Sequence, residues 1–272
     1  MLKKIISGGQ TGADRAALDA AIELGIPHGG WIPKGRITED GPLPDEYKLQ
    51  EMSSDSYPAR TEKNVIESDG TLIVSHGKLT GGSAYTRKMA MKHGKTWFHA
   101  DLNKLPTFQA AMLIEDWISK KGTEILNVAG PRTSEDPTIY GLVTVILELV
   151  FTLTAAKSDT PGQTDDNGKI SDLKSILQPK TAEEAVNFLI KKLSLKDKST
   201  VAKMSEDDLD KLQLSFGLYI RRRLFYPGND ALLESCRQAA NDKYLHRDQA
   251  SGVIIKKLWE TLQETHKLRI VD

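Results

Sequence analysis

The chain has 272 residues, of which 39% are hydrophobic and 27% charged, a composition typical of a soluble globular protein with one large domain or two small ones. Its 37 basic and 37 acidic side chains cancel, so the overall charge draws it neither to nucleic acid nor to anionic lipid. No apolar run approaches the ~20 residues of a membrane-spanning helix, and the N-terminus has no signal-peptide core. Because there is one cysteine, Cys236, the chain has no internal disulfide, and we expect a cytoplasmic protein.

A polar stretch divides the chain into two parts. Residues 157–172 are rich in Pro, Gly, Ser and Asp and contain almost nothing that a core could bury, which is typical of a flexible linker. Residues 1–156 carry 17 basic and 19 acidic side chains, whereas residues 173–272 carry 18 and 14. We therefore expect an N-terminal domain over 1–156 and a C-terminal domain over 173–272.

Strand and helix patterns alternate along the N-terminal domain. Short apolar runs bounded by turn residues predict strands, and apolar residues at helical spacing predict helices. This alternation indicates an α/β domain with a parallel sheet and helices on both faces, in which ligands bind at the carboxyl ends of the strands. The expected strands are 4–7, 26–31, 70–75, 95–99 and 124–129, and the expected helices are 13–24, 60–67, 86–93, 108–121 and 139–155.

Three loops that follow expected strands are rich in Gly, Ser and Thr. Glycines let the backbone approach an anion, and the start of a following helix adds free N–H groups and partial positive charge. Because the ends of parallel strands meet at one edge, we expect an anionic ligand in a shared crevice rather than three simple turns. The candidate ligand contacts are Gly8, Gly9, Gln10, Thr11, Gly12, Asp14 and Arg15 in the first loop, Gly81, Gly82, Ser83 and Thr86 in the second, and Gly130, Arg132 and Ser134 in the third.

A long polar loop between the first two adds three further candidates. Trp31 could stack on a ring, and Lys34 and Arg36 could pair with a phosphate. The alternative is a surface loop whose charged side chains reach into water, which we favour for these residues taken alone. We expect no metal site, because the six histidines show no metal-ligand spacing.

These loops also carry a resemblance. The segments S-G-G-Q-T-G-A-D-R, G-G-W-I-P-K-G-R, R-T-E-K-N-V-I-E-S-D-G-T-L-I-V, T-G-G-S-A-Y-T and L-N-V-A-G-P-R occur in the order seen in the molybdenum carrier family. That family belongs to the Rossmann-like superfamily of lysine-decarboxylase-like proteins, called LOG or SLOG. The resemblance covers about residues 1–155 and implies a Rossmann-like fold that binds a phosphorylated, nucleotide-like ligand, with the molybdenum cofactor and a nucleotide both as candidates. The chain departs from many members in carrying Ile32 where they have Cys.

An enzymatic alternative arises from the same superfamily. The phosphoribohydrolases of the LOG type use a P-G-G-x-G-T-x-x-E motif, in which the Glu assists cleavage of an N-glycosidic bond. This chain has T-G-G-S-A-Y-T-R-K, so Lys88 stands where that carboxylate would be, and we assign no catalytic residue. Asp14, Glu39 or Asp69 could reach in from another loop, and a nucleotide or nucleotide-signal hydrolase stays as the alternative function. The first loop also resembles that of a DNA-processing protein of natural transformation, but the slight acidity of this domain argues against a nucleic-acid partner.

The C-terminal domain reads as all-helical. Thr181–Glu184 and Ser205–Asp208 have the pattern of helix-opening capping boxes, and 232–240 and 253–262 are amphipathic. The stretch resembles a small bacterial helical domain of unknown function. Three consecutive arginines, 221–223, spread around a helix and cannot form one nucleic-acid patch.

Taken together, we expect a carrier or sensor of a phosphorylated nucleotide-like ligand. A further alternative is a nucleotide-sensing regulator whose helical domain acts on a protein partner. We expect a homo-oligomer without a membrane partner.

Overall fold

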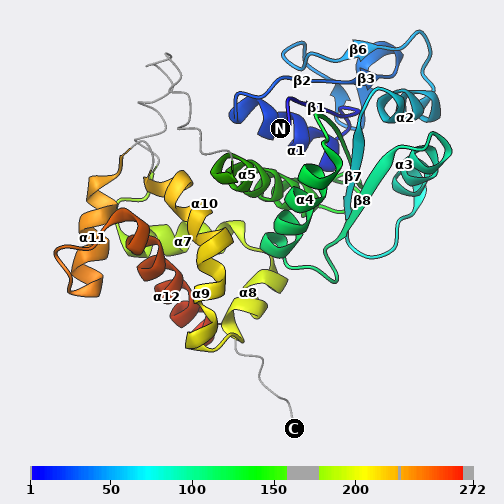
Figure 1. Ribbon diagram of the computed structural model, residues 1–272. Helices are drawn as coiled ribbons and strands as arrows, with labels where there is room; N and C mark the ends of the chain where they lie inside the picture. Colours follow the sequence, from blue (N-terminus) through cyan, green and yellow to red (C-terminus); the bar gives the residue numbers. More distant parts are fainter. Residues whose placement is uncertain (1, 158–177, 226–227, 266–272) are drawn as a thin grey trace. The chain divides into compact units, whose positions relative to one another are not determined.

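The structure is a computed structural model that describes residues 2–157, 178–225 and 228–265 (Figure 1). The chain forms two compact units, Met1–Val150 and Phe151–Asp272. The expected linker over 157–172 begins at the last residue of the helix Ile139–Lys157 and otherwise lies outside the described residues. None of the described helices combines the length and the hydrophobicity that crossing a membrane requires.

The N-terminal unit is built on a main sheet of five parallel strands, and five helices begin within it. The strands of its main sheet are β1 (Lys4–Ile6), β2 (His28–Gly29), β7 (Gly70–Ser75), β8 (Thr96–Asp101) and β9 (Ile125–Ala129). Its helices are α1 (Ala13–Glu23), α2 (Tyr57–Ile66), α3 (Gly81–Lys92), α4 (Thr107–Lys121) and α5 (Ile139–Lys157). Helices α2 and α3 begin three and five residues earlier than the sequence predicts, because Ser56 caps the first and Gly81 opens the second.

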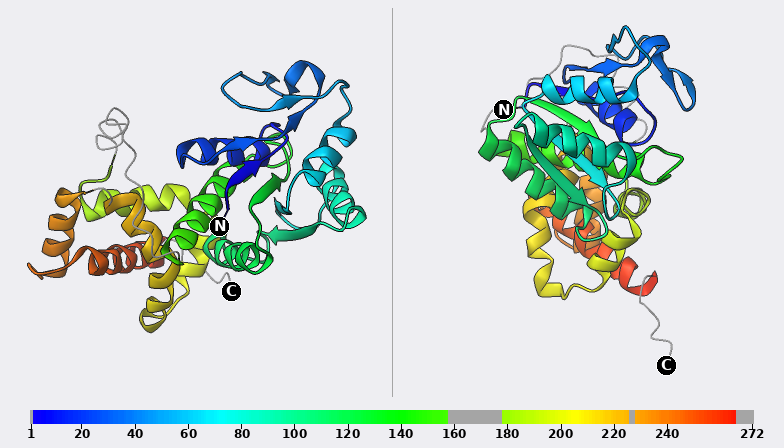
Figure 2. Two further views of the ribbon diagram at one scale, coloured as in Figure 1. Left: turned by 45° about the horizontal axis from the view of Figure 1, so that its top comes forward. Right: turned by 90° about the vertical axis from the view of Figure 1, so that its right-hand side faces the viewer.

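The order of the strands determines which loops lie next to one another. The sheet runs β2-β1-β9-β7-β8, and every pairing is parallel. The connections β1–β2 and β7–β8 leave the centre of the sheet in opposite directions, so right-handed crossovers place α1 and α3 on opposite faces. Figures 1 and 2 show α4 and α5 on the face of α1, and α2 beside α3. The predicted parallel sheet with helices on both faces is confirmed, and the loops after β1, β9 and β7 lie side by side at one edge.

The expected strand over 26–31 is interrupted at Gly30. This glycine has φ 119°, and a Cβ there would lie 2.3 Å from the carbonyl oxygen of Ser7. The chain therefore leaves the main sheet after β2, and β3 (Trp31–Ile32) pairs with β6 (Gln50–Glu51) in a separate small sheet. Two further short strands, β4 (Ile37–Thr38) and β5 (Gly41–Pro42), form a hairpin in this region.

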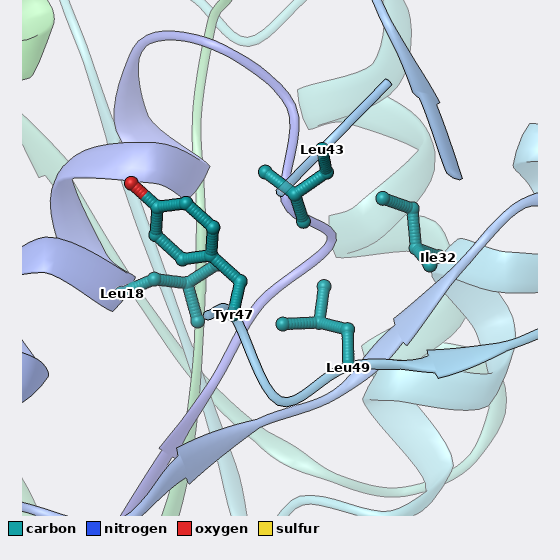
Figure 3. Packing of buried hydrophobic residues seen from close by; sticks show 5 residues of the cluster. All are labelled: Leu18, Ile32, Leu43, Tyr47 and Leu49. Atoms are coloured by element: carbon teal, nitrogen blue, oxygen red, sulfur yellow. The ribbon is translucent and has the colours of Figure 1, made fainter. Parts of the chain in front are cut away.

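A small hydrophobic cluster anchors this excursion to α1. Leu18 of α1 packs with Ile32, Leu43, Tyr47 and Leu49 from residues 31–51. Figure 3 shows Leu18 and Tyr47 on one side of the cluster, Ile32 on the other, and Leu43 and Leu49 between them. Ile32 is fully buried, so this position belongs to the core. The cluster holds the polar residues 33–41 against the start of α1.

The C-terminal unit is helical, as predicted. Thr181 caps α7 by accepting the N–H of Glu184, whereas the Glu184 carboxylate accepts the N–H of Lys180. A complete capping box stands at Ser194 and Asp197, while Ser205 opens only a three-residue 3₁₀ turn. The helices are α7 (Ala182–Lys192), α8 (Leu195–Ala202), α9 (Asp210–Leu212), α10 (Leu218–Ile220), α11 (Asp230–Ala240) and α12 (Arg247–Thr265), with π-helical turns at Gln213–Gly217 and Arg221–Phe225.

Candidate ligand-binding site

Two of the three glycine-rich loops touch directly. We call residues 7–12 after β1 the first loop and residues 130–134 after β9 the third loop. Gly12 has φ 75°, and a Cβ there would lie 2.5 Å from the carbonyl oxygen of Pro131. The same oxygen accepts the backbone N–H of Ala13 at 3.2 Å, which satisfies one of the free N–H groups at the start of α1. Only glycine allows this close approach, so Gly12 joins the two loops.

A carboxylate from the intervening loop lies between them. The hydroxyl of Ser134 donates to Glu39 Oε2 at 2.6 Å, and its backbone N–H donates to Oε1 at 3.2 Å. The hydroxyl of Thr11 donates to the same Oε1 and accepts the backbone N–H of Thr133 at 3.3 Å. We call these donors of Thr11 and Ser134 the hydroxyl cradle. Hydrogen bonds from Ser134 and Thr11 hold the pKa of Glu39 below its ordinary value, with a smaller contribution from Arg132, so this carboxylate is ionised at neutral pH.

Gln10 positions the carboxylate. Its side-chain oxygen Oε1 accepts the backbone N–H of Thr11 at 3.0 Å and that of Glu39 at 2.8 Å. This oxygen therefore ties the polar loop to the first loop. Thr11 is not the cap of α1, because the capping position is Gly12 and the Thr11 hydroxyl is turned to Glu39.

A buried ion pair lies beneath the first loop. Asp14 and Arg60 are 3.3 Å apart, and their side chains are only 9% and 12% exposed. Burial raises the pKa of Asp14, and the charge of Arg60 offsets this only in part. The Arg60 guanidinium lies against Gly8, where a Cβ would fall 1.4 Å from one of its nitrogens. Gly8 and Arg60 thus bring a cation to the backbone of the loop.

An aromatic ring beside this pair lies close to two arginines. The guanidinium carbons of Arg60 and Arg132 lie 5.8 and 5.9 Å from the centre of the Tyr57 ring. The Tyr57 hydroxyl donates to the carbonyl of Ile37 at 3.2 Å, and the residue stays 37% exposed. A ring held this way, with two guanidinium groups close to it, suits a ligand that combines a flat heterocycle with negative charge.

The second loop, which leads into α3, contributes fewer contacts to the site than the sequence predicts. Gly81 and Gly82 are exposed, and a Cβ at either would meet open space. The Thr86 hydroxyl donates to the carbonyl of Gly82 within α3, and Ser83 is half-buried beside it. The loop is linked to the chain after the third loop by His76, whose Nδ1 lies 2.6 Å from a carboxylate oxygen of Asp136.

The remaining expected contacts lie elsewhere. Arg36 donates to the carbonyls of Leu43, Pro44, Tyr47 and Leu49, so its guanidinium organises the loop. Trp31 donates its indole N–H to Glu67 at 2.7 Å and packs against α2. Lys34 is exposed, and Arg15 stacks on Tyr47 while facing Asp40.

Two glycines that follow strands serve different purposes: Gly130 allows close packing, and Gly9 adopts a positive φ. A Cβ at Gly130 would lie 2.5 Å from Val74 O and 2.6 Å from Ala13 Cβ, so this glycine serves close packing. Gly9 has φ 74° above the small hydrophobic cluster. Among the described residues, no group of His, Cys, Asp and Glu could hold a metal ion.

Two residues of this arrangement were not expected as site residues. Tyr57 and Arg60 open α2, and the sequence pattern there reads as an ordinary helix start. Two sequence features could have pointed to Arg60. It begins the R-T-E-K-N-V segment, and the S-G-G loop has a glycine, Gly8, that leaves room for a large side chain beside it.

Comparisons with known proteins identify the family of the N-terminal unit. Residues 5–151 match the family described as "Circularly permutated YpsA SLOG family", and residues 178–262 match a domain of unknown function, DUF6794. A crystal structure from Syntrophus aciditrophicus, titled "Putative molybdenum carrier protein", shares 53% identity over 55% of this chain and 94% of its own, with a TM-score of 0.54. No curated protein matches the chain. The chain belongs to the circularly permutated YpsA SLOG family, and a DUF6794 domain follows its SLOG domain.

Proposed function

We propose that the SLOG domain binds a phosphorylated, nucleotide-like small molecule and holds it as a carrier or sensor. The observation that carries the proposal is the hydroxyl cradle, which already holds an anion, the Glu39 carboxylate. A site that binds one carboxylate with two hydroxyls and a backbone N–H has the donors that a phosphate oxygen needs. Arg132 adds positive charge beside it.

The remaining groups suit the rest of such a ligand. Tyr57 offers a partly exposed ring for a heterocycle, close to Arg60 and Arg132. The similar protein from Syntrophus is titled a molybdenum carrier, and a phosphorylated pterin has both a flat ring and a phosphate. The molybdenum cofactor and a nucleotide are therefore the two cargo classes that we propose.

Calorimetric titration of the full chain with nucleoside monophosphates and with molybdopterin tests this proposal. We expect Ser134→Ala and Thr11→Val each to weaken binding by about tenfold to a hundredfold, because a hydrogen bond to a charged group contributes about 1.5–3 kcal/mol. Thr133→Val is the matched control, since that residue serves the cradle through its backbone N–H. Equal affinity in all four proteins would reject the site.

We further propose that residues 1–156 fold on their own and that the helical domain binds a protein partner or a second copy of the chain. The separate matches of 5–151 and 178–262 support an independent N-terminal domain. A cooperative thermal melt of the 1–156 fragment is the expected result, and a fragment without such a melt would contradict it. Sedimentation of the full chain and of each domain would locate any self-association.

A further inference from the structure

A cavity lies apart from the hydroxyl cradle. It has a volume of about 610 Å³ and lies at the carboxyl ends of β7 and β8. Its walls come from the chain after β7, from α3 and from the chain after β8, and none of the sequence-predicted contacts lines it. Volumes of 300–1,000 Å³ are typical of small-molecule sites.

The cavity has a surplus of positive charge. Lys78, Arg87 and Lys104 line it, together with one carboxylate, Asp101. Among the described residues, neither Lys78 nor Arg87 is ion-paired with a carboxylate, whereas Lys104 lies 3.5 Å from Asp101. Since three cations face one anion, the lining has unbalanced charge that an anionic ligand would neutralise.

Asp101 shapes the wall and is already fully engaged. Its Oδ1 accepts the backbone N–H of Gly77 at 2.7 Å and that of Asn103 at 3.0 Å. Although burial acts in the opposite direction, these bonds and Lys104 lower the pKa of Asp101. The carboxylate therefore ties together the two loops that carry Lys78 and Lys104, and it pairs with Lys104.

The rest of the lining is suited to the organic part of a ligand. Leu79 and Leu105 supply apolar surface. His99 lies on β8 with its Nε2 2.9 Å from the Ser75 hydroxyl, and burial lowers the pKa of His99, so its ring is neutral at neutral pH. Arg87 lies with its guanidinium carbon 5.8 Å from the centre of the Trp97 ring, which orients its planar donors.

We propose that this cavity is a second anion site, which takes the phosphate group of a small organic phosphate ester. Lysines from two loops and an arginine from α3 would surround the phosphate, and Leu79 and Leu105 would contact the ester group. The cavity is separate from the hydroxyl cradle. β9 and β7 stand between β1 and β8, so about three strand spacings, or ~14 Å, separate the two strand ends. One phosphate cannot occupy both, and this inference does not depend on the proposed function.

Phenyl phosphate is a simple probe, and Trp97 and His99 are natural reporters on β8. We expect a saturable shift of the Trp97 indole N–H and His99 ring signals in NMR titrations of the full chain. Arg87→Gln should weaken this binding at least tenfold, and Lys104→Gln should weaken it independently. Lys88→Gln is the matched control, because Lys88 follows Arg87 on α3 but is exposed and does not line the cavity.

The outcomes separate this site from the hydroxyl cradle. Ser134→Ala should leave the Trp97 and His99 titrations unchanged, and inorganic phosphate should bind more weakly than phenyl phosphate because it lacks the apolar group. Absence of a saturable shift, equal weakening by Lys88→Gln and Arg87→Gln, or equal affinity for the two phosphates would overturn the proposal. Loss of the shifts in Ser134→Ala would also overturn it, since it would assign them to the cradle.

Discussion

Ser134 donates both its hydroxyl, at 2.6 Å, and its backbone N–H, at 3.2 Å, to the carboxylate of Glu39, which lies 95 residues earlier in the chain. With the Thr11 hydroxyl, these donors surround an ionised group that belongs to the protein itself. A ligand phosphate that uses the same donors must displace Glu39. The carboxylate would therefore compete with the proposed cargo, and its exposed position allows it to leave.

Removing the Glu39 charge should strengthen binding. Glu39→Gln keeps the size of the side chain but weakens its hold on the donors, and we expect about tenfold tighter binding of nucleoside monophosphates, equivalent to about 1.4 kcal/mol. Glu135→Gln removes a neighbouring exposed charge outside the cradle and serves as the control. Calorimetry that shows weaker binding in Glu39→Gln than in Glu135→Gln would mean that Glu39 assists the ligand instead.

The close approach at Gly12 should make it far less tolerant than other glycines with positive φ. Gly122 has φ 63° with open space around it, so Gly122→Ala should lower the free energy of unfolding by about 1 kcal/mol through backbone strain alone. Gly12→Ala adds the clash with Pro131 and should cost about 3 kcal/mol. Urea denaturation of both variants measures the difference, and equal costs would show that the two loops do not need their contact.

Asp14 gives the fold a pH dependence of known sign. Burial raises its pKa above 3.8 in the folded chain, so the folded state binds this proton more tightly than the unfolded state. Its contribution to stability is complete below the unfolded pKa and is lost as the pH rises through the folded pKa. The stability difference between wild type and Asp14→Asn should therefore fall as the pH rises above about 4. Urea melts at a series of pH values above this point measure it; a difference that rises with pH would show that Arg60 outweighs burial.

The chain should not hydrolyse nucleoside monophosphates at an enzymatic rate. Lys88 is exposed on α3, whose sequence contains no carboxylate, and Glu39 is held as a hydrogen-bond acceptor. Loss of general acid–base help typically costs about 10²–10⁴ in rate, so only slow background release of free base is expected. Chromatography after incubation with AMP is the assay. Turnover near about one per second that disappears in Glu39→Gln would restore the hydrolase alternative.

The sequence predicted the sheet because its signals are local. Runs such as Gly70–Ser75 are buried at every position, and the turn residues that bound them mark where each strand ends. The break at Gly30 was not predictable from such a run, because it arises from contact with Ser7, a residue far away in sequence.

The sequence predicted only those parts of the site that lie in the loops directly after strands. Gly12, Thr11 and Ser134 lie in recognisable loops at the ends of strands, and the structure brings them together. The positions of Glu39 and Tyr57 depend instead on how residues 31–51 fold over α1, which no local pattern encodes. The sequence suggested Arg36 as a phosphate contact because it shows the charge of this residue. It does not show that the guanidinium binds backbone carbonyls of its own loop.

Native mass spectrometry of the gently purified full chain tests the central claim most directly. Wild type should carry a bound small molecule whose excess mass fragments to release phosphate, and Thr11→Val/Ser134→Ala should be purified without it while Thr133→Val retains it. If wild type and the double variant carry the same bound species, or if the bound species contains no phosphate, the hydroxyl cradle is not the cargo site.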